Sequence, residues 1–226
     1  MQTTQHAEYT QRTPRDRAAG GAPLLIFPFN GNGLEALDCL GSAFHLLGFV
    51  DDTLEKQGLN AYGFNVYARA ALAQFAHAQV LAVPGSALTF RWRRAVIEEL
   101  ALDAARFAQV IHPTARVSPL ARIGRNTLIM AGAVVTSNAV IDDHVCVLPN
   151  SVIHHDVHIG AWTLIGANVT IAGHTRIGEN CYVGSGSSLM NGLDISDGSL
   201  IGLGSNVIRD VPAHARVAGN PARSLM

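Results

Sequence analysis

The C-terminal half of the chain carries a strict six-residue repeat, and this repeat constrains the fold more than any other feature of the sequence. Every sixth residue from position 111 to position 207 is branched and aliphatic, with no insertion and no polar substitution. The seventeen positions are Ile111, Val117, Ile123, Ile129, Val135, Ile141, Val147, Ile153, Ile159, Ile165, Ile171, Ile177, Val183, Leu189, Ile195, Ile201 and Val207. Because Ile, Val and Leu make up roughly a quarter of a globular chain, chance agreement is negligible.

Two further columns keep the same register. The fourth residue after each aliphatic is mostly small, and the residue immediately after it is often glycine. Six residues make one short strand and one turn, and three such units close a triangular coil with the aliphatic side chains inside. Glycine, Asn and Asp relieve backbone strain at the turns. Neither helices nor hairpins produce a period of six, so the repeat predicts a left-handed parallel β-helix over residues 111–212.

The N-terminal half reads as a small α/β unit. A strand over Pro23–Phe29 leads into the loop Asn30, Gly31, Asn32 and Gly33, which is followed by a helix over Leu34–Leu40. A second strand, His45–Val50, ends at Asp51 and Asp52; a third strand is expected over Gln79–Val83 and a helix over Leu88–Leu100. This order is typical of a Rossmann-like nucleotide-binding unit. Ala36 replaces the third glycine of that motif, so a tight turn without a ligand explains the segment equally well.

Composition and charge narrow the class of protein. Charged residues make up 15% of the chain and the net charge is −1, so the composition gives no sign of a basic surface for nucleic acid or an anionic membrane. No apolar run approaches the roughly 20 residues of a spanning helix, and the first residues resemble no secretory signal. The three cysteines form no CxxC pair, so we expect no metal. We expect a cytoplasmic protein with a mobile tail over 1–22, a sugar-nucleotide domain over 23–108 and the β-helix, with a C-terminal extension, over 109–226.

One turn of the predicted β-helix carries the residues for acid–base chemistry. His154, His155 and Asp156 follow the aliphatic Ile153, so they occupy a turn and project outwards. Imidazole is the natural base near neutral pH, and an adjacent carboxylate fixes its tautomer. One coil later Gly173 follows His155 in the same column, where it clears space and offers a backbone N–H to a developing oxyanion. His174 shares the column of Asp156, while His144 and His158 have no obvious partner in the sequence.

At this point the residues resemble a known family. A small nucleotide-binding domain before a hexapeptide β-helix is similar to the sialic acid O-acetyltransferases and the bacillosamine and perosamine N-acetyltransferases. The resemblance covers residues 23–226 and is carried by segments 24–40, 44–52 and 151–160. Segments 171–187 and 207–223 match features of hexapeptide transferases in general.

The resemblance implies an acetyl-CoA-dependent acetyltransferase that acts on a nucleotide-linked amino sugar in glycan biosynthesis and assembles as a homotrimer. His155 matches the family's base, Asp156 its supporting acid, and Gly173 the residue that faces the acetyl carbonyl. Ser185, Leu203, Gly173 and Arg223 match positions along acetyl-CoA. The residues Asn30, Gly31, Asn32, Gly33, Asp51 and Asp52 match the sugar-nucleotide site. The family often has histidine where this chain has Asn32, so the contact made by that histidine is altered here.

Three alternatives remain open on the sequence. Acetylation of a sugar hydroxyl uses the same base as acetylation of an amine. A β-helical zinc enzyme needs converging imidazoles, two of them five residues apart on one coil, and the histidines here lack that spacing. A non-catalytic sugar-nucleotide sensor is the third alternative.

Overall fold

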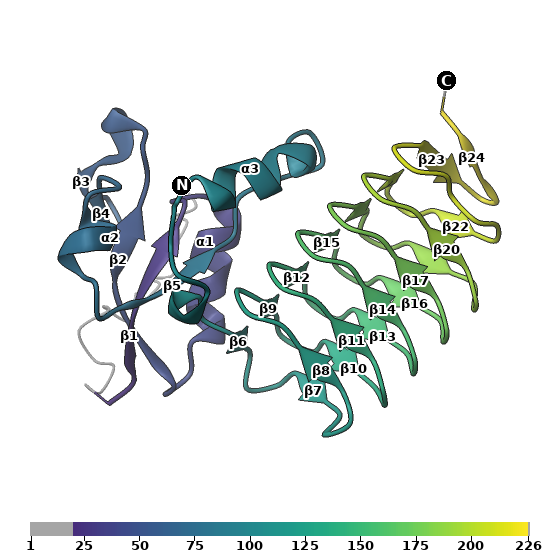
Figure 1. Cartoon of the computed structure of the whole chain (residues 1–226), viewed down its shortest axis with the longest axis horizontal. Coiled ribbons are helices and arrows are strands. Elements are labelled where there is room, and N and C mark those ends of the chain that lie inside the picture. The colour runs from purple at the N-terminus through teal and green to yellow at the C-terminus, as the bar shows by residue number, and fades with distance from the viewer. Residues whose placement is uncertain (1–19, 226) are drawn as a thin grey trace, which may run out of the picture.

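The computed structural model describes residues 20–225, and it contains two regions: a five-stranded α/β domain and a β-helix (Figure 1). Most of the predicted N-terminal tail therefore lies outside the described residues. Within the described part of the chain, no helix is both long enough and apolar enough to cross a membrane.

The N-terminal domain is an open, mostly parallel sheet with the strand order β3-β4-β2-β1-β5. β1 pairs in parallel with β2 on one side and β5 on the other, and β3 alone runs antiparallel to its neighbour. Its strands are β1 (Ala22–Phe27), β2 (Phe44–Val50), β3 (Gly58–Leu59), β4 (Asn65–Tyr67) and β5 (Gln79–Ala82). Its helices are α1 (Gly31–Glu35), η2 (Ala36–Cys39), η3 (Leu54–Lys56), α2 (Ala71–Gln74), η4 (Phe90–Trp92), α3 (Arg93–Glu98) and η5 (Ala104–Arg106). The short elements β3, β4 and α2 were not expected from the sequence.

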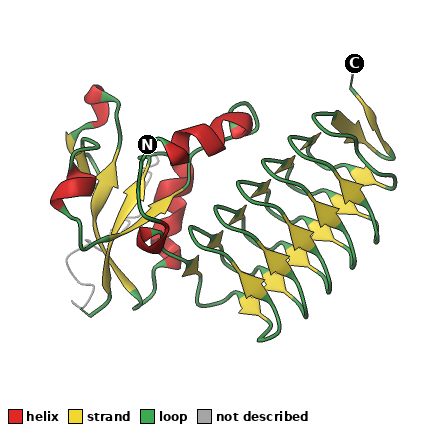
Figure 2. Cartoon of the chain, viewed as in Figure 1, coloured by secondary structure: helices red, strands yellow, loops and turns green. Residues whose placement is uncertain are grey.

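The C-terminal region is a left-handed β-helix of two-residue strands stacked in three parallel faces (Figure 2). Face 1 contains β6 (Val110–Ile111), β9 (Leu128–Ile129), β12 (Cys146–Val147), β15 (Leu164–Ile165), β18 (Tyr182–Val183), β21 (Leu200–Ile201) and β23 (Arg216–Gly219), with β24 (Ala222–Ser224) antiparallel to β23. Face 2 contains β7 (Arg116–Val117), β10 (Val134–Val135), β13 (Val152–Ile153), β16 (Thr170–Ile171), β19 (Ser188–Leu189) and β22 (Asn206–Val207). Face 3 contains β8 (Arg122–Ile123), β11 (Val140–Ile141), β14 (His158–Ile159), β17 (Arg176–Ile177) and β20 (Asp194–Ile195).

The register is the one that the repeat predicts. Strands pair with the strands eighteen residues away, as Ile153 does with Val135 and Ile171. The aliphatic column from Ile129 to Val207 is at most 2% exposed, whereas the first three members, in the first coil, are partly exposed and pack against the end of this core. Burial of these side chains is the main stabilising contribution to the prism.

The turns have a common geometry that positions the site. From Ile123 to Ile201, the third residue after each inward aliphatic adopts a positive φ, mostly as Asn or Gly, the residues that tolerate this left-handed conformation best. The residue that follows is buried, and the hydroxyls of Ser151, Thr163, Thr175 and Ser187 each donate to a backbone carbonyl fifteen residues later, on the next coil. Ser151, for example, donates to the Gly166 carbonyl at 2.7 Å. Asp156 and His174 occupy the left-handed position, with φ of 59° and 61°.

The N-terminal domain packs against the outer surface of face 1. Leu128, Cys146 and Leu164 of that face belong to the same apolar cluster as Leu24 and Leu81 of the domain. The fully buried Arg93 donates hydrogen bonds to the carbonyls of Pro84, His144 and Trp162, and so joins the loop after β5 to the β-helix. The two regions therefore share one interface of apolar and hydrogen-bonded contacts.

Candidate active site

The turn between β13 and β14 holds a histidine–aspartate pair at the corner between faces 2 and 3. His155 Nδ1 lies 2.8 Å from Asp156 Oδ2. Asn138, one coil earlier in the column of Asp156, donates to Asp156 Oδ1 at 3.2 Å. These hydrogen bonds, that from His155 first, hold the pKa of the Asp156 carboxyl below its usual range. The carboxylate is thus charged, and it fixes the imidazole with Nε2 as the free ring nitrogen.

Gly173 creates the space in which the His155 ring lies. A Cβ at position 173 would lie 2.7 Å from His155 Cε1 and 2.8 Å from Nε2, closer than real Cβ contacts come. Among the described residues, no acceptor is hydrogen-bonded to the Gly173 backbone N–H. A basic imidazole and a free amide donor therefore lie on neighbouring coils at an open corner.

His174 completes the polar surface of this corner. Its ring meets the His155 ring edge to face, with centroids 5.0 Å apart, and its Nδ1 lies 3.9 Å from Asp156 Oδ2. Ligand atoms of His155, Asp156 and His174 lie within 4.8 Å of one another, so this group has the donors to hold a metal ion. All three residues are exposed. The set joins two imidazoles from successive coils with one carboxylate and differs from the two-histidine spacing of a β-helical zinc enzyme.

The residues matched to acetyl-CoA lie at a different corner of the same chain. Ser185 and Leu203 follow β18 and β21, so they occupy the corner between faces 1 and 2. Face 2 separates them from His155. Leu203 is 70% exposed, and the backbone N–H groups of Ser185 and Leu203 have no described acceptor. Arg223 is exposed on β24, at the C-terminal end. One chain alone does not bring these residues to His155.

The glycine loop after β1 is held by short-range contacts. The Asn30 side chain caps α1 by accepting from the Gly33 N–H at 2.8 Å, and the Asn32 amide donates to the Gly85 carbonyl at 3.3 Å. A Cβ on Gly33 would lie 2.7 Å from the Pro28 carbonyl oxygen, whereas a Cβ on Gly31 would meet no atom within 4 Å. Packing therefore requires glycine at position 33, while position 31 leaves open space at the carboxyl edge of the sheet.

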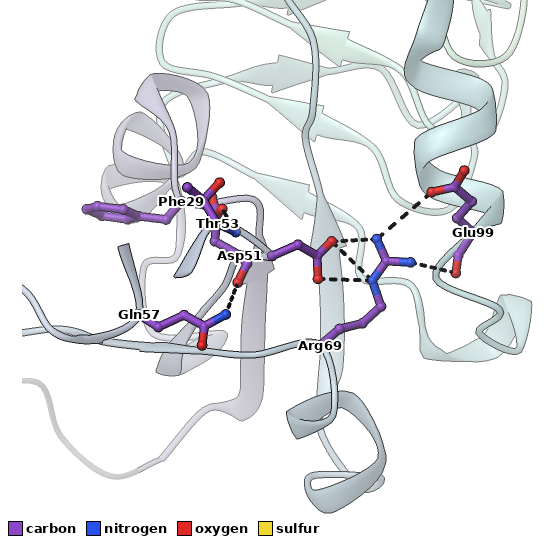
Figure 3. Close-up of polar contacts among 7 residues, drawn as sticks. Phe29, Asp51, Thr53, Gln57, Arg69 and Glu99 are labelled. Carbon is purple, nitrogen blue, oxygen red and sulfur yellow. Dashed lines mark hydrogen bonds and ion pairs between the residues drawn. The ribbon is translucent and has the colours of Figure 1, made fainter. Parts of the chain in front are cut away.

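The acidic pair after β2 already has protein partners (Figure 3). Asp51 is 3% exposed and accepts hydrogen bonds from the backbone N–H groups of Phe29 and Thr53 and from Lys56 Nζ. Burial raises the pKa of Asp51, but the hydrogen bonds from Lys56 and Thr53 outweigh it and leave that pKa below its usual range. Asp52 pairs with Arg69, which also donates to the Glu99 carbonyl.

Several polar partners were missed by the sequence analysis. His158 Nε2 lies 2.8 Å from Asp142 Oδ2, and the His144 ring stacks on Trp162 with centroids 5.5 Å apart. Asn138 could have been found from the eighteen-residue column that contains Asp156. Lys56 and Arg69 carry no comparable sequence signal, because their contacts depend on the fold of the loops around β2.

Comparison with known proteins adds three findings. Residues 120–155 and 138–173 match the family model of the bacterial transferase hexapeptide repeat (six repeats). The acetyltransferase domain of PglB from Neisseria gonorrhoeae, solved with acetyl coenzyme A, is 30% identical; the alignment covers 91% of this chain and 100% of that one, with a TM-score of 0.79. PerB from Caulobacter crescentus, solved with CoA and GDP-perosamine, has the same fold at 24% identity, with coverage of 91% and 98% and a TM-score of 0.77.

A curated relative matches a shorter stretch of the chain. Serine acetyltransferase 4 from Arabidopsis thaliana is 34% identical over 109 residues, which is 47% of this chain. The aligned part spans 28% of that protein's length. This match therefore covers less than half of this chain and leaves most of the relative without a counterpart here.

Proposed function

Because the chain belongs to the hexapeptide-repeat sugar acetyltransferases, we propose that it transfers the acetyl group of acetyl-CoA to the amino group of a nucleotide-linked sugar. The observation that carries the proposal is the His155–Asp156 pair on an open corner above Gly173. The likeness to the PglB acetyltransferase domain over its whole length supports both the reaction and the cosubstrate.

In this proposal His155 is the general base. The acceptor amine must lose a proton as it forms the new C–N bond, and His155 Nε2 accepts that proton while Nδ1 remains on Asp156. Asp156 orients the ring and stabilises the imidazolium that forms. When bound, acetyl-CoA would supply the acetyl group as a thioester; its C–S bond breaks as the C–N bond forms, and CoA leaves as the free thiol. The free N–H of Gly173 is placed to donate to the carbonyl oxygen on which negative charge develops.

The separation of the two corners supports a homotrimer. Within one chain, face 2 lies between His155 and the cofactor residues Ser185 and Leu203, so we propose that a neighbouring chain supplies the second wall of the cleft. From Val134 onward the outward side chains of face 2 are uncharged, namely Val134, Val152, Thr170, Ser188 and Asn206. Exposed apolar side chains, Met190, Leu203 and Ile208, flank this face on its last coils. An uncharged surface with an apolar border is suited to subunit contact.

Assembly can be tested together with the shared site. Sedimentation should give a trimer, and the separate variants His155→Ala and Leu203→Glu should each have low activity. Subunits of the two variants, mixed under conditions that allow exchange, should regain activity because some clefts then combine an intact His155 with an intact Leu203. A fully active monomer, or the absence of any recovery in mixed trimers, would overturn the proposal of a shared site.

We propose that the acceptor binds at the carboxyl edge of the N-terminal sheet, around Asn30, Gly31, Asn32 and Gly33. In open α/β sheets ligands bind at this edge where the strand order reverses, which here lies between β1 and β5. A cavity of about 310 Å³ lies beside the end of α1 and beside η2, and its lining includes Glu35, Asp38 and Pro149. Through Ala131, Pro149 and Ala167 it reaches the corner between faces 1 and 2, the corner that also carries Ser185 and Leu203 on later coils.

The direct test is release of free thiol from acetyl-CoA with UDP-, GDP- and dTDP-linked 4-amino sugars as acceptors. We expect turnover with at least one of them, and an N-acetylated product by mass spectrometry. The matching 4-hydroxy sugars test O-acetylation, and addition of a chelator tests dependence on a metal. Saturable sugar-nucleotide binding without turnover would favour the sensor. Because both substrates are metabolites of the cytoplasm, we place the reaction there.

A further inference from the structure

Lys56 is the one lysine in the 226-residue sequence, and it lies between two loops at the carboxyl edge of the N-terminal sheet. It ends η3, the turn after β2. Its Nζ is 2.9 Å from Asp51 Oδ2 and 3.1 Å from the Phe29 carbonyl oxygen in the loop after β1. The ammonium therefore bridges the two loops that flank the proposed acceptor site.

The Lys56 ammonium keeps one donor for which residues 20–225 supply no acceptor. An ammonium has three N–H donors, and two are accounted for by Asp51 and Phe29. The Lys56 side chain is 40% exposed, whereas that of its partner Asp51 is 5% exposed. Asp51 therefore holds the ammonium on its buried side, and the exposed side remains accessible to a ligand. Other cations of the domain are engaged elsewhere: Arg69 with Asp52, and Arg93 with the interface carbonyls.

The position after β2 assigns this donor to the base end of a nucleotide. In doubly wound sheets the phosphates lie near the first helix, and the groups after the second strand contact the nucleoside. Leu54 of the same turn is 77% exposed, and Phe29, whose carbonyl oxygen accepts from Lys56, is partly exposed, so apolar side chains suited to a planar ring lie close to the charge in the chain. A lysine donates only, so it pairs with a ring carbonyl and opposes a ring amino group.

We propose that Lys56 selects the nucleobase of the acceptor by donating a hydrogen bond to the C4 carbonyl oxygen of uracil or the C6 carbonyl oxygen of guanine, the positions at which cytosine and adenine carry an amino group. This inference rests on the proposed function, since it concerns the sugar nucleotide that the enzyme acetylates. It implies a preference for uracil over cytosine and for guanine over adenine. UDP and CDP form a close pair, because they share the sugar, the phosphates and the C2 carbonyl and differ at C4 and N3, where uracil has a carbonyl and an N–H and cytosine has an amino group and an unprotonated nitrogen.

Calorimetry on the full chain with UDP, CDP, GDP and ADP tests the selection. Wild-type protein should bind UDP or GDP at least about tenfold more tightly than its amino counterpart, as expected for one charge-assisted hydrogen bond. Lys56→Met should abolish this ratio and leave CDP and ADP binding almost unchanged. An equal loss for UDP and CDP would place the ammonium on a phosphate and overturn the base assignment.

Lys56→Met also leaves the buried Asp51 without its cation, so a measurement on unaltered protein is needed. Reductive methylation of wild-type protein modifies Lys56 and the terminal amine. With UDP or GDP present, methylation of Lys56 should slow several-fold, whereas CDP or ADP at the same concentration should protect less and the terminal amine should react at an unchanged rate. Equal rates at Lys56 with every nucleotide would overturn the proposal.

The proposed acetyl transfer and the proposed role of Lys56 can be refuted separately. Acetyl transfer to a sugar nucleotide with no protection of Lys56 would refute the role of Lys56 and leave the proposed function intact. Failure of all four nucleotides to bind, with no acetyl transfer, would remove the proposed function and this inference together.

Discussion

The two regions of the molecule use aspartate in opposite ways. In the β-helix, Asp156 is exposed and its main partner is the imidazole of His155, which leaves one ring nitrogen free. In the N-terminal domain, Asp51 is buried and accepts hydrogen bonds from two backbone amides and Lys56. The first carboxylate supports a group that can exchange protons with a ligand. The second holds the loops around the proposed acceptor site and has little hydrogen-bonding capacity left for a ligand.

The largest expected effect follows from placing a charge in the core of the β-helix. Ile165→Asp places an unpaired carboxylate in a column that is 0% exposed, and we expect a loss of more than about 4 kcal/mol in the free energy of unfolding. Arg122→Asp, on the exposed outer side of face 3, is the matched control and should cost less than about 0.5 kcal/mol. Denaturant unfolding measures both, and similar losses would contradict the register.

The coupling between the regions depends on Arg93. Burial lowers the pKa of its guanidinium to about 10, still high enough to remain charged at neutral pH. Arg93→Met would leave the carbonyls of Pro84, His144 and Trp162 without this donor, and we expect a loss of about 2–4 kcal/mol. Hydrogen exchange should then show faster opening of the N-terminal domain, while the β-helix core stays protected. Uniform deprotection of both regions would show that they unfold as one unit.

The two aspartates after β2 should differ in role: Asp51 positions the neighbouring loops, and Asp52 forms a partly exposed ion pair. Asp51→Asn weakens the bonds to Phe29 and Lys56, so we expect a loss of about 1–2 kcal/mol and weaker acceptor binding with acetyl-CoA affinity unchanged. Asp52→Asn removes a partly exposed ion pair and should cost about 0.5 kcal/mol or less. Calorimetry with both ligands decides between the roles. Unchanged acceptor affinity in both variants would leave the N-terminal domain without a part in substrate binding.

The lowered pKa of Asp51 also predicts how the stability of the protein depends on pH. The folded-state pKa of Asp51 lies below its unfolded value, so its stabilising contribution is fully present above the unfolded pKa near 4 and is lost as pH falls through the folded pKa. Stability of the wild-type protein should therefore fall more steeply below about pH 4 than that of Asp51→Asn. Identical acid profiles would argue against a charged Asp51 in the folded state.

The sequence predicts the two regions with different completeness for a physical reason. In the β-helix, paired strands from β6 to β22 lie eighteen residues apart, so the proximity of His155 to Gly173 and of Asp156 to His174 follows from counting. In the N-terminal domain the partners of Asp51 and Asp52 are Phe29, Lys56 and Arg69, at separations that no repeat fixes. The strands β1, β2 and β5 were predictable from their apolar runs. The protein contacts that occupy the carboxylates of Asp51 and Asp52 were not.

The central claim is that His155 is the base of an acetyl transfer, and its most direct test is the kcat of His155→Ala against that of His154→Ala. With acetyl-CoA and the best acceptor of the panel, His155→Ala should lower kcat by about 100-fold or more, in the range for loss of a general base, while acetyl-CoA binding measured by calorimetry is unchanged. His154→Ala, which alters the adjacent residue outside the Asp156 pair, should retain most of the activity. Equal losses in the two variants, or a larger loss at His154, would contradict the account.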